Sequence, residues 1–560
     1  AEDWIDHVPL NEKYAAGPWR SLDTGFRGEY WSKAIWLFHD SPTLTEAFLQ
    51  KYYDSMILQA EHIMECHSAY RYMSNWGVIE NHGLFEIGVC LPQSEKTKQF
   101  IAFAVKNLEV QVRMQIMPDG VHWEQSPMYH NEVLHCLLDV ILLAKRNDIA
   151  LPDVILRQTE KMAMADVAWL KPDHHIVMMG DSDDVDVRDR ISVAAYLFLN
   201  PVLRFGGFDR LDYESIWDLG MKAGEEYAGM ERRKPDFTSL FLEHSGNIYF
   251  RSDWSERANF LHLHSGTMGA GHGHSDKLHI DLVVNGEDVL MDGGRYTYVS
   301  GSKRFSYKDP SGHNTITVDD LPFTVCKDSW ECSKLSQPVK ENFRCMELAE
   351  FAQAGQLGYM DLPGGVYVNR KVVYIKPDLY VLADEMYTGD RHTYQQYFHF
   401  NNHGTVTQNA LGEKKFPCVA YRGKMAEADF YFVSAQVKAE LKSGHIARHY
   451  NVEEENTVCK VTKQGEGFTS LITVIDAQPG RPLSIEKLPV RSALKQTDYP
   501  ETMAEALKIT AGEKEYVVIL CHQEVNSPTD LVEVDGCMGY GNVIVFDKAG
   551  DVLVGDVLNW

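Results

Sequence analysis

The spacing of apolar residues along the chain changes once, near residue 235. From Trp31 to Tyr227, apolar residues recur three and four positions apart, as in 47–64, 100–112 and 133–143. This spacing is typical of amphipathic helices that bury one face. No strand signal interrupts the series, so the first part of the chain is predicted to form successive helical hairpins in a toroid or solenoid.

Capping and breaking residues divide this helical part. Glu95, Asn131 and Asp153 stand near expected helix starts, and Pro118-Asp119-Gly120 is expected to separate two helices.

After the charged segment 231–236, apolar and polar residues alternate instead, as in 247–251 and 260–264. Alternation of this kind predicts β-strands. Turn signals such as Asn285-Gly286 separate short β-branched runs, including 315–318 and 372–375. The second part of the chain is therefore predicted to form packed antiparallel sheets.

Composition narrows the classes of function. The 560 residues are 44% hydrophobic and carry a net charge of −26, which favours a globular protein and argues against broad nucleic-acid binding. An anionic substrate would need a local basic cleft. No apolar run is long enough to span a membrane, and the N-terminus lacks the features of a signal peptide. Ten cysteines without CxxC pairs predict free, mostly buried thiols.

A polar and aromatic cluster, Asn75-Trp76-Gly77-Val78-Ile79-Glu80-Asn81-His82-Gly83, precedes an apolar run in the helical part. Amides and an imidazole at a helix entry could bind a carboxylate. Alternatively, Asn75 or Asn81 caps the helix and Trp76 packs in the core.

Aromatic residues also crowd the segment 118–130, which contains Trp123, Tyr129 and His130. Aromatic faces commonly grip sugar rings, and Tyr129 could carry a proton if cations lower its ordinary pKa of about 10. A structural role for Tyr129 is the alternative. The string His130-Asn131-Glu132-Val133-Leu134-His135 does not have the HExxH spacing of a zinc protease.

The densest chemical signal lies at the start of the β part. His262, His264, His272, His274 and His279 fall within eighteen residues and are interleaved with glycines. Sets of histidine and aspartate bind zinc, and Asp292 and His313 are further candidate ligands. A structural or pH-sensing cluster is the alternative. The segment 181–186 lacks the glycine and glutamate of a calcium loop, and we interpret it as a capped acidic loop.

Taken in order, these motifs resemble those of the heparinase II/III superfamily. The resemblance rests on Asn75-Trp76, Glu80-Asn81, Tyr129-His130, the segment 271–276, Asp292-Gly293-Gly294 and His313-Asn314-Thr315. It covers nearly the whole chain. It implies an α+β multidomain protein, with an N-terminal incomplete (α/α) toroid over 1–235 and a C-terminal antiparallel β-sandwich over 236–560 that contributes histidines to the cleft.

The resemblance also implies roles for individual residues. In the family, an amide or imidazole neutralises a uronate carboxylate, and a tyrosine about 54 residues later acts on the sugar, which selects Asn75 and Tyr129 here. The histidine from the β domain falls on His272. Substrate-binding or second-choice residues are Glu80, Asn81, His82, Trp123, His130, Lys277, Arg295 and Tyr296. His274, Asp292 and His313 correspond to the ligands of one structural divalent metal, zinc or alternatively calcium.

The activity implied is that of a heparan-sulfate lyase, which cleaves glucosaminyl-uronate linkages by β-elimination to leave 4,5-unsaturated uronates. The expected partner is an acidic glycosaminoglycan, and the protein is expected to be a monomer in the periplasm or outside the cell. Three alternatives stay open: a lyase for alginate or another uronate polymer, a non-catalytic glycan-binding protein, and a glycoside hydrolase using Glu80, Glu124 or Asp183.

Overall fold

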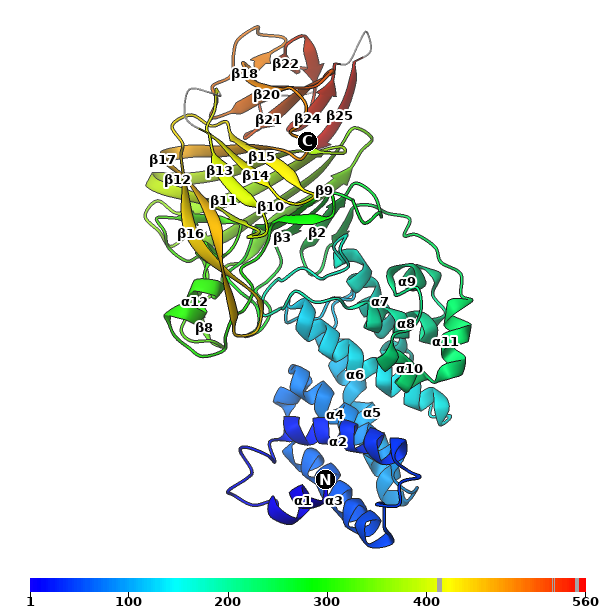
Figure 1. Cartoon of the computed structure of the whole chain (residues 1–560). Helices are drawn as coiled ribbons and strands as arrows, with labels where there is room; N and C mark the ends of the chain where they lie inside the picture. The colour runs from blue at the N-terminus through cyan, green and yellow to red at the C-terminus, as the bar shows by residue number, and fades with distance from the viewer. Residues whose placement is uncertain (410–414, 526, 528, 549–552, 560) are drawn as a thin grey trace. The chain divides into compact units, whose positions relative to one another are not determined.

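The chain folds into two compact units (Figure 1). The computed structural model describes residues 1–409, 415–525, 527, 529–548 and 553–559. The first unit comprises 1–168 and 186–234, and the second comprises 169–185 and 235–560. The short segment 169–185 thus belongs with the β strands although helices precede and follow it, which the periodicity did not indicate.

The first unit is built from helices. Their bounds are α1 Glu2–His7, α2 Ser21–Leu37, α3 Glu46–Cys66, η1 Ala69–Tyr72, α4 Asn75–Cys90, α5 Glu95–Gln115, α6 Pro127–Arg146, α7 Asp153–Trp169, α8 Arg188–Phe198, α9 Pro201–Gly206, α10 Tyr213–Leu219 and α11 Met221–Ala228. None of the helices in the described ranges combines the length and the apolar content needed to cross a membrane.

The starts of α5 and α7 agree with the sequence prediction, but that of α6 does not. Helix α6 begins at Pro127, four positions before Asn131, because proline is well suited to the first turn of a helix. Asn131 lies inside the helix, where its side-chain amide donates to the Pro127 carbonyl at 3.0 Å and to Asp166 Oδ1 at 2.9 Å. The prediction of a helix start at Asn131 was therefore wrong.

Helix α4 lies against α2 at an unusually short distance. A Cβ added to Gly83 of α4 would lie 2.1 Å from the Gly25 carbonyl oxygen, and one added to Gly28 of α2 would lie 2.8 Å from the Gly83 oxygen. Only glycine permits such an approach. It brings polar residues next to these glycines, Glu29 on α2 and His82 on α4, into the same buried layer.

The second unit is built from antiparallel strands. One large sheet contains β1 Leu240–Leu242, β2 Asn247–Arg251, β3 Phe260–His264, β4 His279–Val284, β5 Glu287–Leu290, β6 Ile316–Val318, β9 Pro338–Cys345, β10 Ala349–Tyr359, β11 Val366–Ile375, β12 Leu379–Phe400, β13 Thr405–Gln408, β14 Cys418–Arg422, β15 Glu427–Phe432, β16 Lys438–His449 and β17 Val452–Asp476. The strands predicted at 247–251 and 260–264 are confirmed.

A smaller sheet packs on the large one. It contains β18 Leu483–Leu488, β20 Ala504–Ala511, β21 Lys514–Cys521, β24 Val543–Asp547 and β25 Val554–Asn559. Val373 and Val381 of the large sheet share one apolar core with Leu507 and Val518 of the smaller sheet. The predicted α+β class, with helices first and antiparallel sheets after them, is confirmed.

Short elements complete the second unit. The described chain also contains α12 Ser302–Lys308, η2 Pro310–Gly312, the hairpin of β7 Val325–Cys326 and β8 Cys332–Lys334, and a small sheet of β19 Arg491–Ser492, β22 Val532–Val534 and β23 Cys537–Gly539. Between β4 and β5, Asn285 and Gly286 both have positive φ, 49° and 81°, as the predicted two-residue hairpin turn requires.

Candidate active site

Asn75 occupies the first turn of α4. The Ser74 hydroxyl caps the helix by accepting from the Trp76 backbone N–H, so neither Asn75 nor Asn81 is the cap. The Asn75 side-chain nitrogen donates to Glu124 Oε2 at 2.8 Å. Because an amide nitrogen carries two N–H groups, Glu124 fixes the orientation of Asn75 and uses only one of them.

Glu80 is paired with an arginine that the sequence analysis missed. Arg71 of η1 places its Nε 3.0 Å from Glu80 Oε1, and its guanidinium lies 4.9 Å from the ring centre of Trp76. Burial raises the pKa of Glu80, against the opposing effects of Ser21 and Arg71. Arg71 therefore supplies positive charge close to the start of α4, where Asn75 lies.

Asn81 and His82 lie deeper in the helical unit. The Asn81 amide donates to the Gly77 carbonyl at 2.7 Å, and Asn81 Oδ1 accepts from Asn107 at 3.4 Å. His82 Nε2 lies 3.2 Å from Glu86 Oε1 and 3.4 Å from Asp139 Oδ2. Both side chains are engaged in the core, whereas Asn75 contacts the segment that leads to Tyr129.

Tyr129 is the third residue of α6 and is half-buried. His130, next to it, fixes the preceding loop: its Nδ1 accepts from the His122 backbone N–H at 3.2 Å, so its Nε2 donates to the Met162 carbonyl at 3.1 Å. Burial lowers the pKa of His130 to about 3, so the ring is neutral and has a structural role. Trp123 of the same loop bonds Gln115 through its backbone N–H.

In the β unit, His272 is held by Asp181. His272 Nδ1 lies 3.0 Å from Asp181 Oδ2, and the Asp181 backbone N–H donates to the His272 carbonyl at 2.9 Å. Arg304 donates to both carboxylate oxygens of Asp181, at 2.6 and 2.8 Å, and both side chains are fully buried. Burial opposes ionisation of Asp181, but His272, His274 and Arg304 outweigh it and lower the pKa of Asp181 well below its usual value.

The segment 181–186, interpreted from the sequence as a capped acidic loop, supplies the partners of several basic side chains. Asp181 accepts hydrogen bonds from two histidines and an arginine, and Asp183 binds Arg295 through both carboxylate oxygens at 2.6 and 2.8 Å. Sequence reasoning missed Arg304 entirely, because a single arginine in a short helix carries no local signal.

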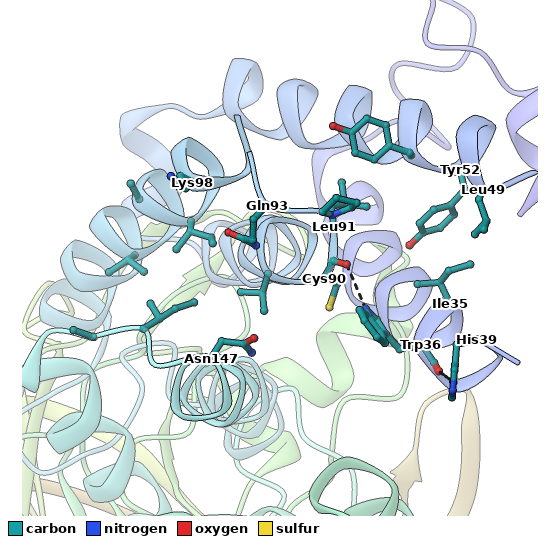
Figure 2. Close-up of a pocket in the computed structure, with 18 of the residues that line it drawn as sticks. Ile35, Trp36, His39, Leu49, Tyr52, Cys90, Leu91, Gln93, Lys98 and Asn147 are labelled. Atoms are coloured by element: carbon teal, nitrogen blue, oxygen red, sulfur yellow. Dashed lines mark hydrogen bonds between the residues drawn. The ribbon is translucent and has the colours of Figure 1, made fainter. Parts of the chain in front are cut away.

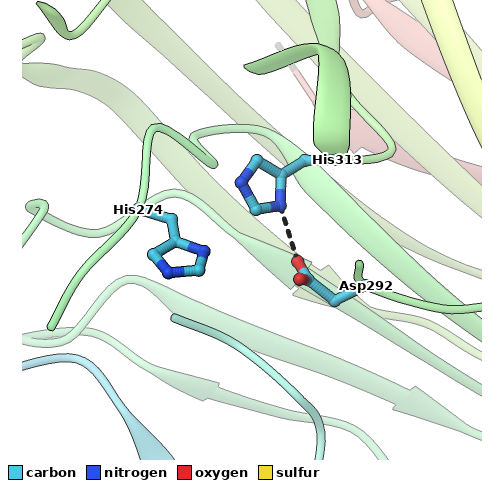
Figure 3. Close-up of side chains that lie close together, drawn as sticks. All are labelled: His274, Asp292 and His313. Atoms are coloured by element: carbon cyan, nitrogen blue, oxygen red, sulfur yellow. Dashed lines mark hydrogen bonds and ion pairs between the residues drawn. The ribbon is translucent and has the colours of Figure 1, made fainter. Parts of the chain in front are cut away.

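His274, Asp292 and His313 converge, as predicted for the metal cluster (Figure 3). Each offers one ligand atom, and these atoms lie within 4.8 Å of one another. His313 Nδ1 lies 2.7 Å from Asp292 Oδ2 and His274 Nε2 lies 2.9 Å from Asp181 Oδ1, which leaves His274 Nδ1 and His313 Nε2 buried without hydrogen-bond partners. Such orphaned nitrogens fit a bound metal ion.

The ionisation of this cluster also fits a metal. Burial lowers the pKa of His274 to about 3, so its ring is a neutral ligand. Burial alone would raise the pKa of Asp292, but His313 and His279 outweigh it and lower that pKa. Neutral imidazoles and an ionised carboxylate are the forms that bind zinc.

The remaining predicted residues of the β unit have other contacts. The buried Lys277 ammonium donates to the Gly266 carbonyl at 2.7 Å, and burial lowers its pKa to about 8. Arg295 donates to Tyr298 as well as to Asp183. Tyr296 has a positive φ of 50° and stacks on Tyr307, with ring centres 5.5 Å apart. Lys277 is thus a structural residue, and Arg295 is fixed by its two partners.

Two further histidines of the motif, His262 and His264, stabilise the strands. His262 Nδ1 lies 2.9 Å from Asp281 Oδ2, and His262 and His264 both contact Asn247 Oδ1, as expected for residues on one face of β3. These pairs tie β2, β3 and β4 together.

A large, mostly apolar cavity of the helical unit lies elsewhere (Figure 2). It measures about 1230 Å³, and its lining includes Trp36, Leu49, Tyr52, Leu91 and Ile101. None of the predicted catalytic residues lines it, so its size alone does not make it the reaction site.

The two units define an α+β multidomain protein, and comparison with protein families identifies which one. The heparinase II/III N-terminus model matches residues 1–201, and the heparinase II/III-like C-terminal model matches residues 235–481. These matches cover most of the chain. The protein belongs to the heparinase II/III family.

Individual relatives are distant. The heparin-sulfate lyase of Pedobacter heparinus is 25% identical over 354 residues, which are 59% of this chain and 49% of the relative. That of Bacteroides thetaiotaomicron is 23% identical over 411 residues, 69% of this chain and 54% of the relative. The chain thus spans about half the length of the curated relatives it matches.

Solved structures share the fold. The heparan sulfate lyase HepC of Pedobacter heparinus superposes with a TM-score of 0.70 at 19% identity, over 94% of this chain and 78% of that one. A crystal structure of heparinase III superposes with a TM-score of 0.74 at 16% identity, over 93% of this chain and 78% of that one.

Proposed function

We propose that the protein is a polysaccharide lyase that cleaves heparan sulfate or a related acidic glycosaminoglycan at uronate residues by β-elimination. The observation that carries the proposal is a fixed tautomer. Because Asp181 is ionised and accepts from His272 Nδ1, the Nε2 of His272 is the side of the ring able to accept a proton. Membership of the heparinase II/III family and the similarity to heparin-sulfate lyases support the same activity.

The first requirement of the reaction is charge neutralisation. The C5 proton of a uronate is hardly acidic while the neighbouring carboxylate keeps its full negative charge. Asn75, oriented by Glu124, would donate its second N–H to that carboxylate, and Arg71 near the same helix start adds positive charge. Donors fixed in advance toward developing charge are worth several kcal/mol in catalysis.

Proton transfer then falls to Tyr129 and His272. Tyr129 would protonate the departing O4. For a glucuronate, whose C5 proton and leaving group can be handled from one face, Tyr129 can act as base and acid in turn. For an iduronate, His272 would remove the proton, and Asp181 would stabilise the imidazolium that forms.

A metal would serve the scaffold rather than the reaction. His274, Asp292 and His313 would hold one divalent ion, zinc by its donor set, which joins the strand-connecting loops near His272. We also propose that the protein works as a monomer in the periplasm or outside the cell, where its polymeric substrate would be accessible.

The test is ultraviolet absorbance of the products from heparan sulfate, heparin, alginate and hyaluronan incubated side by side. A lyase leaves a C4–C5 double bond conjugated with the uronate carboxylate, and this product absorbs in the near ultraviolet. We expect absorbance to rise with heparan sulfate. New reducing ends without absorbance would show a hydrolase, and binding without either would show a glycan-binding protein.

A further inference from the structure

A second group of metal-ligating side chains lies in the helical unit, apart from the residues of the proposed reaction. Glu29 comes from α2, and His135 and Asp139 come from α6. His135 and Asp139 are four positions apart and therefore share one face of their helix. The close approach of α2 and α4 at Gly25 and Gly83 brings Glu29 next to the buried side chains of α4.

The spacing of the ligand atoms is that of a metal site. His135 Nε2 lies 3.0 Å from Glu29 Oε1 and 3.7 Å from Asp139 Oδ2, and the ligand atoms of all three residues lie within 4.8 Å of one another. Ligands of a tetrahedral zinc ion with bonds of about 2.0 to 2.1 Å lie about 3.3 Å apart. Small side-chain movements would therefore complete the coordination.

A cationic group already occupies this position. The Lys33 ammonium lies 2.6 Å from Asp139 Oδ2 and 3.2 Å from Glu29 Oε1. Its side chain is 28% exposed, and a third carboxylate, Asp218, lies 3.7 Å from it. Lys33 can therefore swing toward solvent and Asp218 without leaving the two metal-ligating carboxylates buried and unpaired, provided that another cation replaces it.

An access route and unused ligand capacity accompany the site. Glu29, Lys33, His135 and Asp139 line a cavity of about 360 Å³. Behind Asp139, His82 Nε2 lies 3.4 Å from Asp139 Oδ2 and 3.2 Å from Glu86 Oε1. Glu86 Oε2 is buried without a hydrogen-bond partner, so this oxygen is a further donor atom beside the cluster.

We propose that Glu29, His135 and Asp139 bind one divalent transition-metal ion of the zinc class, which enters through this cavity and displaces the Lys33 ammonium. His82 positions Asp139 from behind, as outer groups commonly do for a ligating carboxylate. Nitrogen and carboxylate donors in this combination favour zinc, cobalt or manganese over calcium. The site is independent of the proposed lyase activity and of the cluster of His274, Asp292 and His313.

The test is titration of the metal-free full-length chain with Co²⁺, followed by its visible absorption, and with Zn²⁺, followed by calorimetry. Wild type is compared with His135→Ala, Lys33→Met and His7→Ala, in which an exposed histidine of the same unit is removed. Any ion bound in the β unit is common to all four proteins and cancels in the comparison.

We expect His135→Ala to bind one fewer ion than wild type or to weaken one site by at least about tenfold. Lys33→Met should strengthen that site by about tenfold or more, because it removes the competing ammonium, and a misfolded protein could not show this gain. His7→Ala should match wild type. Equal binding by wild type and His135→Ala, together with no gain in Lys33→Met, would overturn the proposal, whatever the lyase assay shows.

Discussion

Histidines of this chain differ in their ability to act as a general base because their hydrogen-bond partners fix different tautomers. His130 accepts a backbone N–H at Nδ1 and donates from Nε2 to a carbonyl, so both nitrogens serve the fold. His272 lies against the ionised Asp181 and is 13% exposed, beside the aromatic ring of Trp330 at 5.3 Å. Only the second environment suits a general base.

At the same scale, Tyr129→Phe tests the assignment of the proton carrier. The change removes one oxygen, so folding and substrate binding should survive while turnover of heparan sulfate falls by at least about 10²-fold. Steady-state kinetics would measure turnover as kcat and substrate affinity through KM. The control is Tyr213→Phe, which changes an exposed tyrosine of the same unit. If Tyr129→Phe keeps near-normal turnover, the assignment is wrong.

His272→Ala separates the two routes of proton removal. If Tyr129 performs both transfers on glucuronate, His272→Ala should keep about a tenth or more of glucuronate cleavage but lose iduronate cleavage. Product analysis on substrates of defined uronate content measures this. Equal losses on both substrates would make His272 the base for each.

At the scale of elements, the segment 169–185 supplies the groups that order the histidine loop of the β unit. Asp181→Asn should destabilise that unit by about 3 to 5 kcal/mol, because the fully buried Arg304 loses its charge partner. Urea unfolding would measure the change. The matched control Glu331→Gln breaks the exposed pair with Lys327 and should change the free energy of unfolding far less. Similar costs for the two variants would contradict a structural role of the Asp181–Arg304 pair.

A second prediction at this scale concerns the metal cluster of His274, Asp292 and His313, which joins loops of the β unit. The protein purified without chelator should contain zinc, and removing the zinc should lower the melting temperature of the β unit. An ion that binds only the folded state stabilises that state by about 4 kcal/mol when the free ion is at about a thousandfold its Kd. Elemental analysis and calorimetry test this. In His313→Ala, chelation should leave that transition unchanged. Full stability and activity without this ion would leave the three residues as a hydrogen-bonded cluster.

At the scale of the whole molecule, the helical unit should lose stability in mild acid. The folded pKa of His130 is about 3 against an ordinary value near 6.5, so between these pH values the unfolded chain binds more protons. The free energy of unfolding should therefore fall as pH falls below about 6.5, by up to about 1.4 kcal/mol per pH unit from this residue. Urea unfolding at pH 7, 6 and 5 should show a shallower slope in His130→Gln, and parallel slopes would refute the assignment.

The sequence by itself determined the order of helices and strands and the positions of the main motifs. Apolar residues spaced three and four positions apart, or alternating with polar ones, reflect side-chain geometry within a single helix or strand. Both patterns can therefore be recognised in the sequence before the tertiary structure is known. The Asn285-Gly286 turn and the shared face of His262 and His264 were predictable for the same reason.

Only the tertiary structure decided which charged groups meet. Asp181 and Arg304 are 123 residues apart, and Lys33 and Asp139 are 106 apart, yet the first pair forms a buried contact and the second a partly buried one. Nothing local marks such residues, because an isolated buried charge is unfavourable and becomes tolerable only when packing brings its partner to it. The partners of His272 and the ligands around Lys33 were therefore set by the packing of distant segments, whereas the secondary structure was set by neighbours in sequence.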